Sequence, residues 1–127
     1  MPRDQASRWL VEGGYQAVAD QIFGGLHARR LLFEYDDPRS EGFEPLVRVP
    51  TDRWVVLGLV TTKQSRLESV DDLARRIEVV SRYVPLERLA VSPQCAFATS
   101  VLGNALALDD ERAKLRLVAE AARKVWG

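Results

Sequence analysis

The sequence has very few of the residues that carry most metal and redox chemistry: one cysteine, one histidine and one methionine among 127 residues. A single cysteine cannot form an internal disulfide, which is typical of a protein from a reducing compartment. No apolar run approaches the roughly 18 residues of a membrane span, and the first residues, MPRDQASRW, lack the apolar segment of a signal peptide. We therefore expect a cytoplasmic protein without a membrane partner.

Neither sign of charge is in excess, because 18 basic residues balance 18 acidic ones. No basic stripe is interleaved with aromatic residues, so nucleic acid is not expected as a partner. Hydrophobic residues make up 46% of the chain and charged residues 28%, which is the composition of a folded globular protein. The length predicts a single domain over residues 1–127.

Three short apolar runs predict β-strands, at residues 29–36, 53–62 and 87–93. The centre of the second run, VVLGLV, is apolar without alternation, which is typical of a strand covered on both faces of a parallel sheet.

Helical patterns precede, separate and follow these runs. They cover residues 15–23, the segment from Ser69 to just before Pro85, and the segment from Asp109 or Asp110 towards the C-terminal end. Ser69 and Asp72 have the spacing of a capping box. The last helix is predicted to bury an apolar stripe formed by Leu115, Val118, Ala122 and Val125. Residues 37–52 are predicted to form a long loop with at most a short helix.

The order of elements predicts an α/β fold built from consecutive βα units with parallel strands. Three parallel strands alone leave two open edges and an incompletely covered face. We expect Leu32, part of VVLGLV, and Val91 on this inner face. The chain is therefore predicted to be part of something larger or to associate, either as a homo-oligomer or with a partner chain.

Chemistry in α/β folds gathers at the carboxyl ends of the strands, which makes Glu34 a candidate residue. Alternation along the first strand places Leu32 and Glu34 on one face and Phe33 on the other. A carboxylate on the inner face needs a partner, because an unpaired buried charge is unfavourable. Either it pairs with a cation such as Arg39 or Lys63, or it binds a metal.

Cys95 follows the third strand, just after Ser92-Pro93-Gln94. A lone cysteine is usually a small buried hydrophobic residue. Alternatively, Glu34 and Cys95 could share a zinc ion, although two ligands are too few for a tetrahedral site. His27 cannot join them from within this chain. It precedes Glu34 by seven extended residues, which is roughly 23 Å at about 3.3 Å per residue, and we expect it at the surface.

Thr61, Thr62 and Lys63 lie at the carboxyl end of the second predicted strand. Two hydroxyls and an ammonium group could bind an anionic substrate group there. The alternative is a solvated start of a loop.

Several blocks of the sequence together resemble the C-terminal part of the cobalamin-independent methionine synthase family. They are EGGY at 12–15, LLFEYDDPR at 31–39, GLVTTK at 58–63, VPLERLAVSPQCAF at 84–97 and RAKLRLVAEAARKVW at 112–126. The blocks occur in the family's order over nearly the whole chain, and they are most similar to the branch that contains the epoxyalkane:coenzyme M transferases.

The resemblance implies the last three βα units of a (β/α)8 TIM-type barrel with a preceding helix. It also implies zinc as a cofactor, with Glu34 and Cys95 as metal ligands and Thr62 and Lys63 as possible substrate contacts. The implied reaction transfers a methyl or alkyl group to a small thiol such as homocysteine or coenzyme M, held by zinc as a thiolate.

One departure from the family pattern concerns the remaining zinc ligands. The family has a His-x-Cys pair shortly before the segment that corresponds to residues 7–9, whereas residues 1–6 read MPRDQA. The resemblance therefore leaves two functional hypotheses. The chain either contributes to a zinc-dependent transferase completed by another chain, and is inactive alone, or is a non-catalytic barrel fragment that folds by self-association.

Overall fold

The computed structural model of the protein describes residues 15–16, 18–35, 42–94, 97 and 106–127. The three predicted strands are confirmed with slightly narrower bounds: β1 at Arg30–Glu34, β2 at Trp54–Val60 and β3 at Leu89–Pro93. The main helices are α1 at Ala19–Gly25, α2 at Val70–Val80 and α3 at Leu108–Trp126. Two short 3-10 helices, η2 at Glu44–Arg48 and η3 at Leu86–Arg88, precede β2 and β3 respectively.

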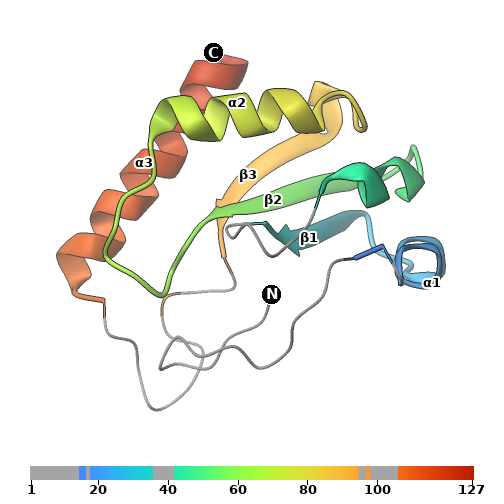
Figure 1. Ribbon diagram of the computed structural model, residues 1–127, viewed down its shortest axis with the longest axis horizontal. Coiled ribbons are helices and arrows are strands. Elements are labelled where there is room, and N and C mark those ends of the chain that lie inside the picture. Colours follow the sequence, from blue (N-terminus) through green and yellow to red (C-terminus); the bar gives the residue numbers. More distant parts are fainter. Residues whose placement is uncertain (1–14, 17, 36–41, 95–96, 98–105) are drawn as a thin grey trace.

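The strands form one parallel sheet in the order β1-β2-β3, with β2 at the centre. Helices α2 and α3 lie against the half of the sheet formed by β2 and β3, and α1 lies near β1 (Figure 1). The predicted βα arrangement is therefore confirmed, as is the open character of the sheet among the described residues. None of the helices in these residues is long and apolar enough to cross a membrane.

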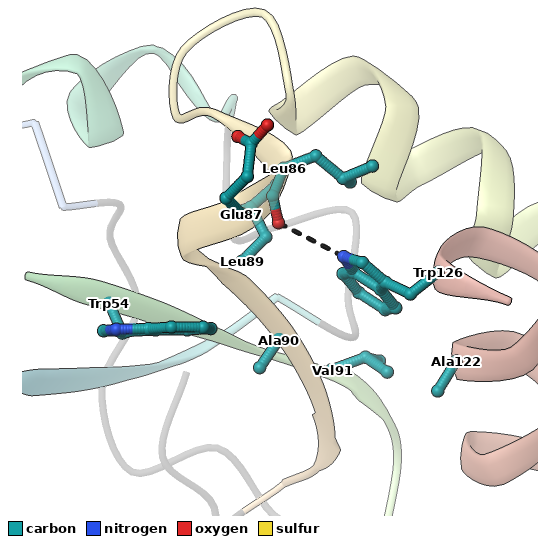
Figure 2. A pocket seen from close by; sticks show the side chains of 8 residues that line it. All are labelled: Trp54, Leu86, Glu87, Leu89, Ala90, Val91, Ala122 and Trp126. Carbon is teal, nitrogen blue, oxygen red and sulfur yellow. Dashed lines mark hydrogen bonds between the residues drawn. The ribbon is translucent and has the colours of Figure 1, made fainter.

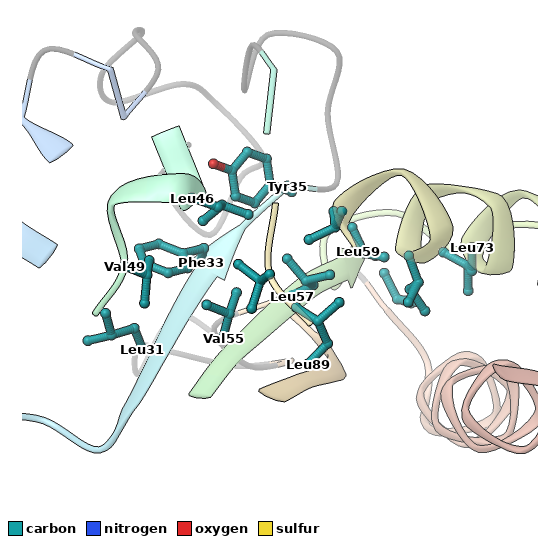
Figure 3. Close-up of a cluster of buried hydrophobic side chains, with 14 of the residues drawn as sticks. Leu31, Phe33, Tyr35, Leu46, Val49, Val55, Leu57, Leu59, Leu73 and Leu89 are labelled. Carbon is teal, nitrogen blue, oxygen red and sulfur yellow. The ribbon is translucent and has the colours of Figure 1, made fainter. Parts of the chain in front are cut away.

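The helix-covered face of the sheet contains the hydrophobic core. Leu31, Phe33 and Tyr35 alternate onto this face and are almost completely buried. Leu46 lies in η2 and Val49 just after it, and both pack over these residues of β1. The core continues along β2 to Leu73 of α2 (Figure 3). Tyr15 adds an aromatic edge, with its ring 5.1 Å from that of Phe33 in a T-shaped arrangement.

The opposite, inner face of the sheet is partly open. Leu32 is paired with Val56, which is paired with Ala90, so these three side chains form a row on this face. Leu32 is 71% exposed. The prediction that Val91 lies on this face is wrong, because Val91 is paired with the buried Leu57 on the helix side. The face on which Val91 lies depends on how β3 pairs with β2, and the sequence alone does not give this pairing.

Helix α2 begins as predicted, since the Ser69 hydroxyl accepts a hydrogen bond from the Asp72 backbone N–H at 3.4 Å. The predicted stripe of α3 is partly wrong. Its buried residues are Lys114, Leu117 and Ala121, whereas Leu115 is 48% exposed. Lys114 occupies the first position of the observed buried face. A pattern that counts only apolar residues therefore places the buried stripe about one residue too far towards the C-terminus.

Candidate functional site

A cavity of about 130 Å³ opens at the carboxyl end of the sheet. We call it the Glu34 cavity; its lining residues are Leu32, Phe33, Glu34, Gly58, Ser92, Pro93 and Gln94. All three strands contribute to it, because Glu34 is paired with Gly58 and Gly58 with Ser92 across the sheet. A carboxylate and a hydroxyl therefore flank a residue without a side chain.

Gly58 is needed in the middle of this row because there is no space for a side chain. A Cβ atom at this position would lie 2.9 Å from the carbonyl oxygen of Phe33 and 3.5 Å from that of Pro93. The pairing of β2 with β3 is also irregular between Gly58 and Val60. Such irregularities redirect the strand that carries them, and they are frequent beside functional sites.

Glu34 is half-buried, and its backbone N–H donates a hydrogen bond to the Tyr15 hydroxyl at 3.2 Å. This contact joins two segments 19 residues apart at the end of β1. Sequence reasoning used Tyr15 only as the end of a helix pattern and of a family block, and did not foresee this contact. Arg39, one of the proposed partners of Glu34, lies outside the described residues.

Gln94 continues the pairing of β3 beyond the strand, with its backbone N–H donating to the Val60 carbonyl at 2.9 Å. Its side-chain Nε2 is buried and makes no hydrogen bond to the part of the protein that the structure describes. Gln94 immediately precedes Cys95 in the sequence. Cys95 itself lies outside the described residues, so its predicted role stays a prediction.

A metal site cannot be assembled from the described residues alone. Nowhere in them do three or more histidine, cysteine, aspartate or glutamate side chains gather in a way that could hold an ion. His27 is exposed and lies beside a separate hollow with Arg29, Asp52 and Arg53, close to the beginning of β1. Its predicted surface position is therefore confirmed.

The segment after β2 is interior, so the alternative of a solvated loop start is wrong. Thr61, Thr62 and Lys63 are 4%, 0% and 3% exposed. A buried lysine requires compensating polar neighbours, because desolvation of its ammonium group is unfavourable. Neither Thr62 nor Lys63 is among the residues that line the Glu34 cavity. Their predicted contact with a substrate remains a prediction.

Two residues that sequence reasoning missed hold this segment in place. The Thr61 backbone N–H donates to Glu68 Oε1 at 2.8 Å, and Lys114 Nζ of α3 lies 3.4 Å from Glu68 Oε2. Lys114 Nζ also donates to the Arg66 carbonyl at 2.6 Å. The available signal was Lys114 itself, a lysine in helical register with Leu117 and Ala121.

Tyr35 follows Glu34 but lies in the core, beside Tyr15 and Phe43. Burial raises the pKa of its phenol, and the nearby Tyr15 and Glu44 raise this pKa further. Tyr35 is therefore neutral at physiological pH and acts as a packing residue.

A third hollow, of about 320 Å³, follows the edge of β3 that pairs with no strand among the described residues. We call it the β3 groove; it is lined by Trp54, Leu86, Glu87, Leu89, Ala90, Val91, Ala122 and Trp126. Figure 2 shows Trp54 on one side of β3, and Trp126 with Ala122 on the other. The Trp126 Nε1 donates to the Leu86 carbonyl at 3.2 Å, which fixes the end of α3 over the edge of the sheet.

Three parallel strands with helices on one face, and a polar row at the carboxyl end of the inner face, define a segment of an α/β barrel. The family model described as "Cobalamin-independent synthase, Catalytic domain" matches residues 32–124. The chain therefore belongs to the cobalamin-independent methionine synthase-like family.

Two proteins of Bacillus subtilis (strain 168) are similar to nearly the whole chain. The uncharacterized protein YxjG is 54% identical over 121 residues, which are 94% of this chain and 32% of YxjG. The uncharacterized protein YxjH is 46% identical over the same shares of the two chains. The chain thus spans about a third of the length of the curated relatives that it matches.

Two solved structures have the same fold over this segment. The putative vitamin-B12 independent methionine synthase from Listeria monocytogenes matches with a TM-score of 0.71 and 36% identity, over 91% of this chain and 33% of its own. A B12-independent methionine synthase from Shewanella sp. W3-18-1, solved in complex with selenomethionine, matches with a TM-score of 0.71 and 16% identity, over 87% of this chain and 30% of its own. The second match, at this low identity, concerns the fold alone.

Proposed function

We propose that this chain contributes the C-terminal part of a zinc-dependent site that transfers a methyl or alkyl group to a small thiol such as homocysteine. The observation that carries the proposal is the Glu34 cavity. Glu34 and Gln94, the residue before Cys95, line it together at the carboxyl end of the sheet. Family membership supports the same class of reaction.

The donors of this chain fit half of a zinc site. A carboxylate and a thiolate are both common zinc ligands, but tetrahedral coordination requires further donors. We propose Glu34 and Cys95 as the two ligands from this chain, with the others supplied by a polypeptide outside these 127 residues. By itself, the chain then binds zinc weakly and has no transferase activity.

Each proposed residue has a distinct task. Bound zinc lowers the pKa of a coordinated thiol, so that the substrate is held as a reactive thiolate. Glu34, at the end of β1, would supply one ligand, and Tyr15 restrains its backbone by accepting a hydrogen bond from the Glu34 N–H. Thr62 and Lys63 provide a hydroxyl and an ammonium group for the anionic end of the substrate.

Zinc binding by the purified chain tests this proposal. We expect weak binding in calorimetric titration, and Co²⁺ should give a thiolate charge-transfer absorption. Cys95→Ser should abolish that absorption, and Glu34→Gln should weaken the affinity at least tenfold. Removal of a residue that supports a ligand weakens metal affinity by about 10- to 100-fold, and removal of a ligand itself should weaken it more.

Glu78→Gln is the matched control for Glu34→Gln, since Glu78 is an exposed carboxylate on α2. It should leave both affinity and absorption unchanged. Equal metal affinity in all four proteins would show that Glu34 and Cys95 form no site. A protein without metal affinity would favour the second hypothesis, a non-catalytic barrel fragment.

For the isolated chain we propose a second copy of itself as partner. Leu32 is 71% and Trp54 44% exposed on the inner face, and the β3 groove continues this apolar surface around the edge of β3. Exposed apolar surface and a free strand edge both favour association. The second copy would shield from water the apolar side chains that the remaining strands shield in a complete barrel.

Light scattering at micromolar concentration should therefore give a mass above that of a 14.3 kDa monomer. Leu32→Lys should shift the population towards the monomer, because it introduces a charge into the proposed contact. Leu115→Lys is the control, since Leu115 is also exposed but lies on α3. A monodisperse monomer, or equal effects of the two lysines, would refute this association.

A further inference from the structure

The inner-facing residues of β1 carry charges of opposite sign at the two ends of the strand. Burial alternates along β1, so that Arg30, Leu32 and Glu34 lie on the inner face and the residues between them lie in the core. Leu32, in the middle, is 71% exposed. At about 3.3 Å per residue, the cation and the carboxylate lie about 7 Å to either side of it. The inner face of β1 is therefore positive at its amino end, apolar at its centre and negative at its carboxyl end.

The positive end of this face is accessible from outside the chain. Arg30 is paired with Trp54, which is 44% exposed, and both line a hollow at the amino end of the sheet. None of the ion pairs among the described residues involves Arg30. A guanidinium group beside an exposed apolar ring can therefore take a carboxylate from a second molecule.

A two-fold axis at Leu32 would bring opposite charges together. In a symmetric dimer the same patch is used by both copies, so that each contact between two different residues occurs twice. When two inner faces pack with their β1 strands antiparallel, Leu32 meets Leu32 of the second copy, and Arg30 of each copy meets Glu34 of the other. Sheets packed face to face lie about 10 Å apart, a gap that an arginine and a glutamate bridge from opposite sides.

The other symmetric way to pack the two faces does not match the charges. With the axis along the strands, the two β1 strands run parallel. Arg30 would then face Arg30 of the second copy, and Glu34 would face Glu34 of the second copy. Like charges opposite each other at an interface are strongly unfavourable, so the charges of β1 select the antiparallel arrangement.

We propose that two copies of this chain bind through their inner faces with β1 antiparallel to β1, so that Arg30 of each copy pairs with Glu34 of the other. This inference rests on the self-association proposed above, and it identifies the residues that fix the orientation of the partner. Apolar contact at Leu32 and Trp54 supplies affinity, whereas the ion pairs supply specificity. The dimer covers the Glu34 cavity of both copies, so self-association and completion of this site by another polypeptide exclude each other.

Charge reversal tests the pairing in the chain itself, without a metal or a substrate. Arg30→Glu leaves two carboxylates on the inner face of β1, and Glu34→Arg leaves two cations. Each variant alone should have a dissociation constant at least about tenfold higher than the original chain in sedimentation equilibrium, because like charges then meet. An equimolar mixture of the two variants restores both pairs of unlike charges, as does the double variant Arg30→Glu/Glu34→Arg. Both should associate with a dissociation constant within about threefold of the original.

Arg82→Glu and Glu78→Arg are the matched controls. They make the same changes of charge at exposed positions, in α2 and just after it, on the helix-covered side of the sheet. Neither should change the dissociation constant, alone or in a mixture. Arg30 is exposed, so Arg30→Glu should fold, and its comparison with Arg82→Glu decides the question even if Glu34→Arg does not fold.

Two outcomes would contradict the pairing in different ways. A monomeric unsubstituted chain would overturn the proposed self-association and this inference with it. Equal association of Arg30→Glu and Arg82→Glu would overturn this inference alone, as would folded single variants that do not recover association when they are mixed. The contact between the copies would then lie elsewhere, and the proposed zinc site would be unaffected.

Discussion

Lys114→Met is expected to destabilise the folded chain by about 3 kcal/mol, because it leaves the Glu68 carboxylate buried without its cation. Glu68 is only 10% exposed, so water cannot replace the lost ammonium group without a change in the local structure. The carbonyl of Arg66 loses its donor at the same time. Chemical denaturation followed by tryptophan fluorescence measures this difference in the free energy of unfolding.

The double variant Lys114→Met/Glu68→Met should recover most of this loss, to within about 1 kcal/mol of the original chain, since neither charge then remains in the interior. Lys124→Met should leave the free energy of unfolding nearly unchanged, because the Lys124–Asp71 pair is exposed and its attraction is screened by solvent. A Lys114→Met chain as stable as the original would mean that Glu68 is not desolvated in solution. A double variant as unstable as the single one would mean that Lys114 stabilises the fold through its packing alone.

The strands were predictable from the sequence because each contains a short apolar run, LLF in β1, WVVLGLV in β2 and LAV in β3. The alternation along β1 also placed Glu34 and Phe33 on opposite faces correctly. The pairing between strands was not predictable, and Val91 was therefore placed on the wrong face. Pairing depends on contacts between residues distant in the sequence, whereas alternation is a local property.

The candidate site was predictable only in part, for a similar reason. Glu34 was found because it ends a strand that sequence pattern can locate. Ser92 and Gly58 join it only through the pairing of three strands, which no local pattern encodes. The Lys114–Glu68 pair was missed because its members lie 46 residues apart and a lysine is usually expected at the surface.

A second large effect on stability is expected for β1, where adjacent residues lie on opposite faces of the sheet and should respond differently to substitution. Phe33→Ala should destabilise the chain by about 3–5 kcal/mol, since it removes a large buried side chain and leaves a cavity. Phe33 is 5% exposed, and its ring lies 5.0 Å from that of Phe23 and 5.1 Å from that of Tyr15. The loss therefore includes ring contacts that hold α1 and the segment around Tyr15 against the sheet.

Leu32→Ala is the matched control, because Leu32 precedes Phe33 but is 71% exposed on the inner face. It should change the stability of the monomer by less than about 0.5 kcal/mol, as surface substitutions usually do. At micromolar concentration it should instead weaken self-association. A loss of stability in Leu32→Ala that depends on protein concentration would show that Leu32 lies in a contact between chains. A loss in Phe33→Ala that does not depend on concentration would show that Phe33 belongs to the core of a single chain. Similar losses of stability in both variants, independent of concentration, would mean that the inner face is covered within the chain itself. The description of the sheet as open on this face would then be wrong.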